Sequence, residues 1–280
     1  MNTRSALCAS AIAAILVTGC GGGSAAPIPA PSASSTTAIA PADQLAVARA
    51  DLAPTGRLRV AIFGPPFVGS RDATGQIHGV AVALASELGA KLGTEVVVDV
   101  YESPDDAIKA QSTWDVLFIP SNANPGVAAA LAYTAPFLLI PHTFLVSDPA
   151  IRTATDLDRS VIRIATESSH AAQLHAQLPA AKVVTVENAE GLAQLKAGTV
   201  DAFAAGRFAL LDALKDLPAG YHVLDGSFFT ATLAIGIGKD RPAGLVWLGG
   251  FIEAQRSSGA LQKIVDATGK QGLEVPAVAY

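Results

Sequence analysis

Short apolar, β-branched stretches alternate with amphipathic stretches from residue 58 onward, and this alternation constrains the fold more than any other feature of the sequence. Residues 58–63 have the composition of a buried strand, while residues 79–92 repeat apolar side chains at helical spacing and stop at Gly93. Strands that alternate with helices in this way are typical of parallel sheets covered by helices on both faces. The sequence therefore predicts an α/β protein.

The expected elements form two similar series. The first has strands at 96–101, 115–119 and 143–146 and a helix at 103–111; the second has strands at 161–166, 182–186 and 201–204 and helices from 169, at 188–197 and up to 214. In both series a helix ends shortly before an aspartate that opens a strand, at Asp115 and at Asp201. This echo favours two lobes of duplicated architecture.

The N-terminus has the composition of a targeting segment. Arg4 precedes a short apolar run at residues 6–17, which is too short to span a bilayer stably. The following Val-Thr-Gly-Cys resembles a bacterial lipobox, which implies a signal peptide over residues 1–19 and a lipid on Cys20. An ordinary secretory signal with a chance cysteine is the alternative. Residues 20–51 begin with an almost uncharged Gly, Ser and Pro-rich stretch, so we expect a flexible linker there.

Composition excludes several classes of function. The formal net charge of −5 gives no basic footprint for nucleic acid. Both cysteines, Cys8 and Cys20, lie at the extreme N-terminus, which excludes a disulfide scaffold, a cysteine zinc site and a cysteine nucleophile from the folded body. The histidines His142, His175 and His222 are isolated in sequence and no His, Asp or Glu spacing is typical of a metal site, so we expect no metal and no cofactor.

Four stretches resemble, in order, the bacterial extracellular solute-binding proteins of family 3, the polar-amino-acid-receptor type. They lie at residues 58–93 (LRVAIFGPPF…), 114–146 (WDVLFIPSNAN…), 195–210 (LKAGTVDAFAAGRFAL) and 232–269 (TLAIGIGKDRP…). The resemblance implies a two-lobed type II periplasmic-binding-protein fold, in which each lobe is a mainly parallel sheet flanked by helices. Lobe 1 would comprise residues 52–145 plus 235–280 and lobe 2 residues 148–230, with a two-strand hinge at 142–147 and 231–236.

The resemblance also implies a function. Such a protein captures a small-molecule solute in the cleft between its lobes and delivers it to the permease of an ABC transporter, here as a monomer held by Cys20 on the periplasmic or extracytoplasmic face of a membrane. Two alternatives remain open. One is an enzyme similar to cyclohexadienyl dehydratase, with Glu167 and His170 as acid and base. The other is a sensor or scaffold lipoprotein that has lost its ligand.

The chain departs from the family pattern at charged positions. The arginine that grips a ligand carboxylate in amino-acid receptors corresponds to Val127 here, and the acid that binds the amino group corresponds to Gly206. The common aspartate of the first helix corresponds to Ala83. Without the first two charges, burial of a zwitterion would be strongly unfavourable. We therefore expect a neutral, more apolar or singly charged solute rather than a standard amino acid.

The candidate binding residues follow from strand ends and helix starts in this arrangement. Aromatic side chains after the first strand could stack on a solute, polar residues at a strand's carboxyl end lie where open α/β sheets bind ligands, and a Ser-rich helix start could bind an anion. An arginine beside the missing acid could bind a carboxylate or phosphate. The candidates are Phe63, Phe67, Ser121, Asn122, Glu167, Ser168, Ser169, His170 and Arg207. Core packing, turn formation and helix capping are the alternative roles.

Overall fold

The computed structural model describes residues 41–122 and 125–277. The predicted signal peptide, Cys20 and the first part of the predicted linker lie outside the described residues. Within the described part, no helix combines the length and the apolar character needed to cross a bilayer.

Lobe 1 is built on three parallel strands with cores on both faces. The strands are β1 (Arg57–Ile62), β4 (Glu95–Val100) and β5 (Val116–Pro120), and the helices are α2 (Val80–Leu92), α3 (Pro104–Lys109), α8 (Pro242–Ser257) and α9 (Ala260–Asp266). Successive side chains of a strand point to opposite faces of its sheet. Accordingly Val116 and Phe118 belong to one hydrophobic cluster, while Leu117 and Ile119 belong to another.

Lobe 2 repeats this plan. Its parallel strands are β8 (Arg163–Thr166), β9 (Lys182–Thr185) and β10 (Ala202–Gly206), and its helices are α5 (Ser168–Gln177), α6 (Asn188–Lys196) and α7 (Arg207–Leu214). These elements match the second predicted series to within a few residues. The short β11 (His222–Val223) pairs with β7 at the edge of this lobe.

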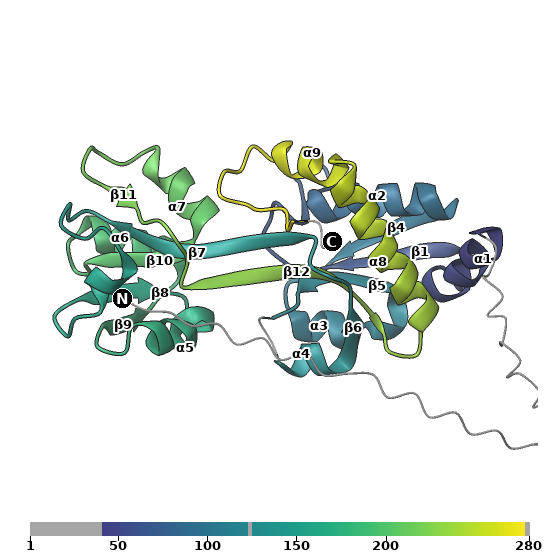
Figure 1. The fold of residues 1–280 in the computed structure, drawn as a ribbon, viewed down its shortest axis with the longest axis horizontal. Helices are drawn as coiled ribbons and strands as arrows, with labels where there is room; N and C mark the ends of the chain where they lie inside the picture. The colour runs from purple at the N-terminus through teal and green to yellow at the C-terminus, as the bar shows by residue number, and fades with distance from the viewer. Residues whose placement is uncertain (1–40, 123–124, 278–280) are drawn as a thin grey trace, which may run out of the picture. The chain divides into compact units, whose positions relative to one another are not determined.

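Two long strands, β7 (Leu138–Val146) and β12 (Phe229–Gly238), run side by side from one lobe to the other (Figure 1). They pair antiparallel from Leu138 opposite Leu233 to His142 opposite Phe229. The rest of β7 pairs with β10 in lobe 2, and the rest of β12 pairs with β5 in lobe 1. One sheet with the order β4-β1-β5-β12-β7-β10-β8-β9 therefore passes through both lobes.

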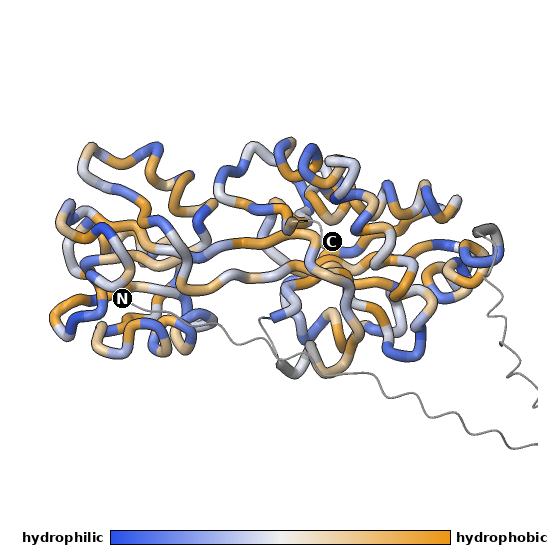
Figure 2. The backbone as a smooth tube through the Cα atoms, viewed as in Figure 1, coloured by the Kyte–Doolittle hydropathy of each residue, from blue (hydrophilic) through white to orange (hydrophobic). Residues whose placement is uncertain are grey.

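This pairing moves the lobe boundary from its predicted place. Residues 143–146 were predicted as part of the hinge at 142–147 and, up to residue 145, of lobe 1, but they pair with β10 of lobe 2. The segment of β7 that pairs with β12 is 138–142. In Figure 2 the hydrophobic colour follows much of β7.

The remaining elements are β2 (Ser70–Arg71), β3 (Ile77–His78), α4 (Pro125–Ala130), β6 (Leu131–Tyr133) and the 3₁₀ turns Gln111–Thr113 and Ala154–Leu157.

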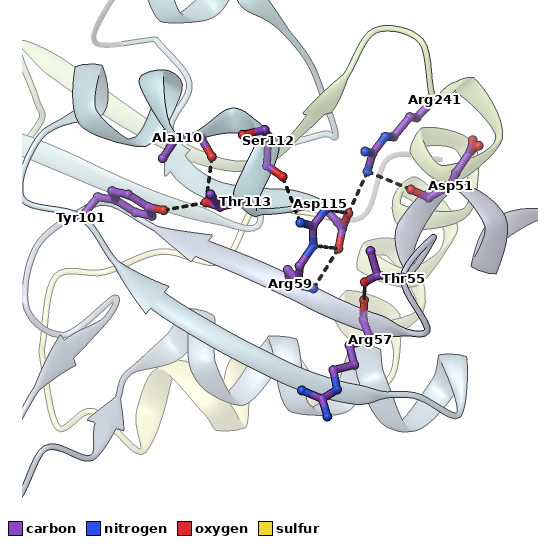
Figure 3. Close-up of polar contacts among 10 residues, drawn as sticks. All are labelled: Asp51, Thr55, Arg57, Arg59, Tyr101, Ala110, Ser112, Thr113, Asp115 and Arg241. Atoms are coloured by element: carbon purple, nitrogen blue, oxygen red, sulfur yellow. Dashed lines mark hydrogen bonds and ion pairs between the residues drawn. The ribbon is translucent and has the colours of Figure 1, made fainter.

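The helix α1 (Pro41–Leu52) corrects the prediction that residues 20–51 are a flexible linker throughout. It packs against α8, with Ala48 and Leu52 buried. The Asp51 carboxylate accepts the backbone N–H of Gly244 at 2.7 Å, and the Asp51 carbonyl accepts a bond from Arg241 at 3.1 Å (Figure 3). The folded body thus begins before Leu52. The helix α1 has little amphipathic character, and the contacts at the C-terminal end of α1 hold it against the body.

The two aspartates of the sequence echo occupy equivalent positions. Asp115 accepts the backbone N–H of Arg59 at 3.0 Å, and its own N–H donates to the Arg59 carbonyl at 2.8 Å. Asp201 exchanges the same two bonds with Arg163, at 2.7 and 2.8 Å. The duplicated architecture is therefore present in hydrogen-bond detail. Only Asp115 also binds a second guanidinium, that of Arg241 at 3.1 Å (Figure 3).

Candidate functional site

A cavity of about 810 Å³ lies between the lobes. Lobe 1 lines it at the carboxyl ends of β1 and β5, with Phe63 just after β1 and Pro120 as the last residue of β5. Lobe 2 lines it with α5, α6 and α7. The connecting strands contribute His142 and Phe229, which are opposite each other in the β7–β12 register. Ligands of open α/β folds bind outside the carboxyl ends of strands, which is the position of this cavity.

A pair of histidines forms the most distinctive part of the wall. The rings of His142 on β7 and His170 on α5 lie 4.3 Å apart, centre to centre. Phe229 packs against both, at 5.4 Å from His142 and 5.6 Å from His170. His142 Nδ1 lies 2.9 Å from the Ile140 carbonyl oxygen. Because a carbonyl can only accept, the proton of neutral His142 is on Nδ1, and Nε2 has a lone pair.

His170 is oriented by its own helix. Its Nδ1 lies 3.3 Å from the Ser169 hydroxyl and 3.8 Å from a carboxylate oxygen of Glu167. The carboxylate favours the tautomer with the proton on Nδ1, as in His142. Among the described residues, no protein group hydrogen-bonds to Nε2 of either ring.

Burial controls the charge of these groups. Burial lowers the pKa of His142 to about 4, and the neighbouring His170 contributes to the shift. Burial also lowers the pKa of His170. Burial raises the pKa of Glu167, and the carboxylate of Glu187 adds to this effect. Both imidazoles are therefore neutral near pH 7. No group of three or more His, Cys, Asp or Glu side chains within the described ranges is placed to hold a metal ion.

Comparison with solved structures finds the same architecture in binding proteins. An ancestral amino acid-binding protein, a precursor of cyclohexadienyl dehydratase, matches with 23% identity over 78% of this chain and 96% of its own, at a TM-score of 0.59. A lysine-bound ABC-transporter binding component from Wolinella succinogenes matches with 21% identity over 76% of this chain and 95% of its own, at a TM-score of 0.61. The unliganded L-cystine receptor of Neisseria gonorrhoeae matches with 19% identity over 81% of this chain and 98% of its own, at a TM-score of 0.62. The chain has the type II periplasmic-binding-protein fold. No family model and no curated protein sequence matches it.

Four predicted binding residues line the cavity of this periplasmic-binding-protein fold: Phe63, Glu167, Ser169 and His170. Phe67 does not; it packs edge-on against Phe208, with ring centres 4.8 Å apart, and lines a separate hollow beside α2 and α9. Ser168 begins α5 but is not part of the wall. Val127, at the predicted position of the family arginine, belongs to α4.

The polar atoms of the other candidates bind the protein itself. The Ser121 hydroxyl donates to the Thr232 carbonyl at 3.0 Å. The Asn122 amide donates to the Thr230 carbonyl at 2.9 Å and accepts the Thr232 N–H at 3.0 Å, so it extends the pairing with β12. Arg207 donates to the Gly226 carbonyl at 2.6 Å. None of the three lines the cavity, and their predicted contact with a solute stays a prediction.

The sequence prediction missed His142 and Phe229, as well as Phe203 and Phe208, all of which line the cavity. A signal was available for the first of these: His142 opens a predicted hinge segment, and hinge strands of this fold border the cleft. Isolation in the sequence argued against a role for His142. Its partner His170 comes from another element of lobe 2, so the pair exists only in the folded chain.

Proposed function

We propose that this protein is the solute-binding component of an ABC importer, which captures a small molecule between its lobes and delivers it to the permease. The observation that supports this most directly is the cavity of about 810 Å³, whose wall comes from both lobes and both connecting strands. A solute bound there would contact both lobes at once and favour a closed arrangement. The neighbours that bind lysine and L-cystine are consistent with a small-molecule solute.

The solute we propose is not a standard zwitterionic amino acid. Among the residues described as lining the cavity there is no lysine or arginine, and most of the wall is apolar. Gly206 lines the cavity where amino-acid receptors have an acid. Burial of an α-carboxylate without a cationic partner costs several kcal/mol, roughly the penalty for an unpaired charge.

A solute library measured by thermal shift should identify a single chemical class that raises the melting temperature of the purified protein. At a free concentration of one hundred times Kd, a ligand adds about 2.7 kcal/mol to the free energy of unfolding. The solute should be recovered chemically unchanged by mass spectrometry. Absence of any shift across neutral, cationic, anionic and zwitterionic solutes would contradict a receptor and favour the ligand-free scaffold.

The same geometry supports an enzyme as a second candidate. Glu167 and His170 lie 3.8 Å apart in the wall of the cavity, and burial raises the pKa of Glu167, as is usual for general acids. One neighbour is described as a precursor of cyclohexadienyl dehydratase. Conversion of the library solute by the purified protein, lost in Glu167→Gln, would establish this candidate in place of the receptor.

We also propose that a lipid on Cys20 holds the protein on the extracytoplasmic face of a membrane. Replacement of Cys20 by serine should move the protein from the membrane fraction to the soluble fraction, because a thioether-linked lipid needs the sulfur and each buried CH₂ contributes about 0.8 kcal/mol. Cys8→Ser is the matched control, since Cys8 lies inside the predicted signal peptide. Retention of the Cys20→Ser protein in the membrane fraction would contradict the anchor.

A further inference from the structure

The polar side chains in the cavity wall mostly present acceptors. Among the described lining residues these side chains are His142, Glu167, Ser169, His170 and Gln173. The Nδ1 proton of His142 is directed to the Ile140 carbonyl, and Nδ1 of His170 faces Glu167 and Ser169, so each ring has its Nε2 lone pair left for a solute.

Gln173 follows the same pattern. With its amide oriented to satisfy both neighbouring backbone carbonyls, its nitrogen donates to the Ser169 carbonyl at 3.2 Å and to the His170 carbonyl at 3.3 Å. The side-chain oxygen is then the amide atom left for the cavity. Glu167 accepts only, when ionised. Because the N–H groups of His142, His170 and Gln173 are directed to protein atoms, the Ser169 hydroxyl is the only side-chain donor left for a solute among the described residues that line the cavity.

The remaining wall consists largely of apolar and aromatic groups. Phe63, Phe203, Phe208 and Phe229 all line the cavity. Aromatic faces attract a cation that has left water, and they also accept the apolar body of a solute. The aromatic rings and the acceptor atoms thus favour the same kind of solute, one with a cationic hydrogen-bond donor and an apolar body.

Electrostatics point in the same direction. Glu187, which precedes α6, interacts unfavourably with Glu167, so two carboxylates repel each other beside this part of the wall. Arg207, at the start of α7, directly follows the lining residue Gly206, and its guanidinium donates to the Gly226 carbonyl. A bound cation would relieve the repulsion between the two carboxylates, whereas an anion would add to it.

We propose that the solute is an organic monocation: an ammonium group without a carboxylate, attached to an apolar body. The ammonium donates to the imidazole nitrogens, with Glu167 supplying the countercharge, and the phenylalanine side chains hold the apolar body. This inference rests on the proposed receptor function and specifies the chemical class that the receptor binds. It also explains why the arginine of amino-acid receptors is dispensable here: the solute has no carboxylate for it to bind.

Four probes with a shared phenyl-and-two-carbon skeleton test the inference. They are 2-phenylethylamine, 2-phenylethanol, 3-phenylpropanoate and phenylalanine, which present a cation, a neutral hydroxyl, an anion and a zwitterion. Titration calorimetry at pH 7.5 should show the amine binding at least about tenfold more tightly than each of the others, the worth of one hydrogen bond to a charged group. An alcohol that binds equally well, or tighter binding of the carboxylate or the zwitterion, would overturn the inference and leave the receptor function standing.

Two histidines of one helix provide a matched pair of variants. His170→Leu should weaken amine binding about tenfold, because it removes one acceptor while keeping an apolar side chain in place. His175→Leu changes an exposed histidine of the same helix and should leave the affinity unchanged. Equal effects of the two substitutions would overturn the assignment of His170, provided that circular dichroism shows both variants folded.

The pH dependence distinguishes a cation from an anion by its sign. Protonation of His142, His170 or Glu167 removes an acceptor and adds positive charge, so amine affinity should fall as the pH decreases from 7.5 to 4. At pH 4 half of His142 is protonated in the free protein, since its pKa is about 4, which alone gives at least about a twofold loss. Affinity that rises toward acid would indicate an anionic solute and overturn the inference.

Failure of the inference can be told apart from failure of the receptor function. If no probe binds, the class of the library solute decides: a solute with a basic nitrogen and no carboxylate supports the inference, and any other class overturns it. If no library solute binds either, the receptor function itself is wrong, and the inference falls with it.

Discussion

Replacement of Asp115 by alanine should lower the free energy of unfolding by about 3 kcal/mol. The carboxylate is fully buried and accepts bonds from the Arg59 backbone N–H, from the Arg59 guanidinium at 2.8 and 3.0 Å, and from Arg241 at 3.1 Å (Figure 3). Without it, the two guanidinium groups and one backbone N–H lose their anion. Because both arginine side chains are about one quarter exposed, water compensates in part, which places the loss at the lower end of the range for broken buried pairs.

The duplicated architecture supplies the control. Asp201→Ala removes the equivalent carboxylate of lobe 2, but that side chain is 36% exposed and its guanidinium partner, Arg163, lies 3.9 Å away. Its loss should cost about 1 kcal/mol, in the range for a hydrogen bond and an exposed ion pair. Urea denaturation followed by circular dichroism gives both values. Equal losses in the free energy of unfolding would contradict the view that burial and the second arginine make Asp115 contribute more to stability than Asp201.

Gly79→Ala should be similarly destabilising, by about 3 kcal/mol, because two penalties combine. Gly79 has φ +139°, and a Cβ atom there would lie 2.3 Å from the carbonyl oxygen of Val68. The neighbouring N–H groups of Val80 and Ala81 donate to Phe67 and Val68 at 3.0 and 2.9 Å. A displaced backbone would break these bonds and move the loop that contributes Pro65 and Pro66 to the cavity, so solute affinity should fall together with stability.

Gly75→Ala separates backbone strain from the steric clash. Gly75 also has a positive φ, +87°, but a Cβ atom there would meet nothing within 4 Å. Its substitution should therefore cost only about 1 kcal/mol, the penalty for a left-handed L-residue, and should not affect the cavity. The two variants are compared by their melting temperatures and by solute affinity. A Gly79→Ala variant as stable as Gly75→Ala would contradict the prediction, because it would show that the Val68 backbone moves away from the added Cβ atom at little cost in free energy.

Local patterns in the sequence were sufficient for the parallel strands of both lobes and for the helices α2, α3, α5, α6 and α7. The apolar repeat predicted α2 up to Gly93, which has a left-handed φ of +63° and caps the helix. Ser103, the predicted first residue of the helix at 103–111, accepts the N–H of Asp106 at 3.1 Å. Such features succeed because capping and periodicity depend on residues a few positions apart.

The connecting strands were harder to predict, for a reason that lies in one residue. The sequence analysis predicted a strand only at 143–146, although Pro141 lies in a longer apolar run at 138–146. Proline lacks the N–H that a central strand uses, which makes such a run hard to recognise as one strand. In the structure Pro141 lies in β7 opposite Thr230 of β12. The helix α1 was missed for a different reason: the contacts of Asp51 with the body are to residues far away in the sequence, Arg241 and Gly244.

The cavity wall was predicted in part. Glu167, Ser169 and His170 were found because they follow a strand and begin a helix, a position that places side chains at the cleft of this fold. Ser121 and Asn122 also follow a strand, yet their side chains donate hydrogen bonds to the β12 backbone. Which polar residues face a solute depends on which backbone groups need partners, and the local sequence does not specify that.

The continuous sheet has a consequence for the energetics of folding. Along β7, Leu138 and Ile140 belong to the core of lobe 1, whereas Phe144 and Val146 belong to the core of lobe 2. Both cores include side chains of β7. If one lobe unfolded and β7 separated from it, apolar side chains that β7 covers in the other lobe would also become exposed. The two lobes should therefore form one cooperative unit, in which a mutation deep in lobe 1, such as that of Asp115, is felt as lost stability in lobe 2.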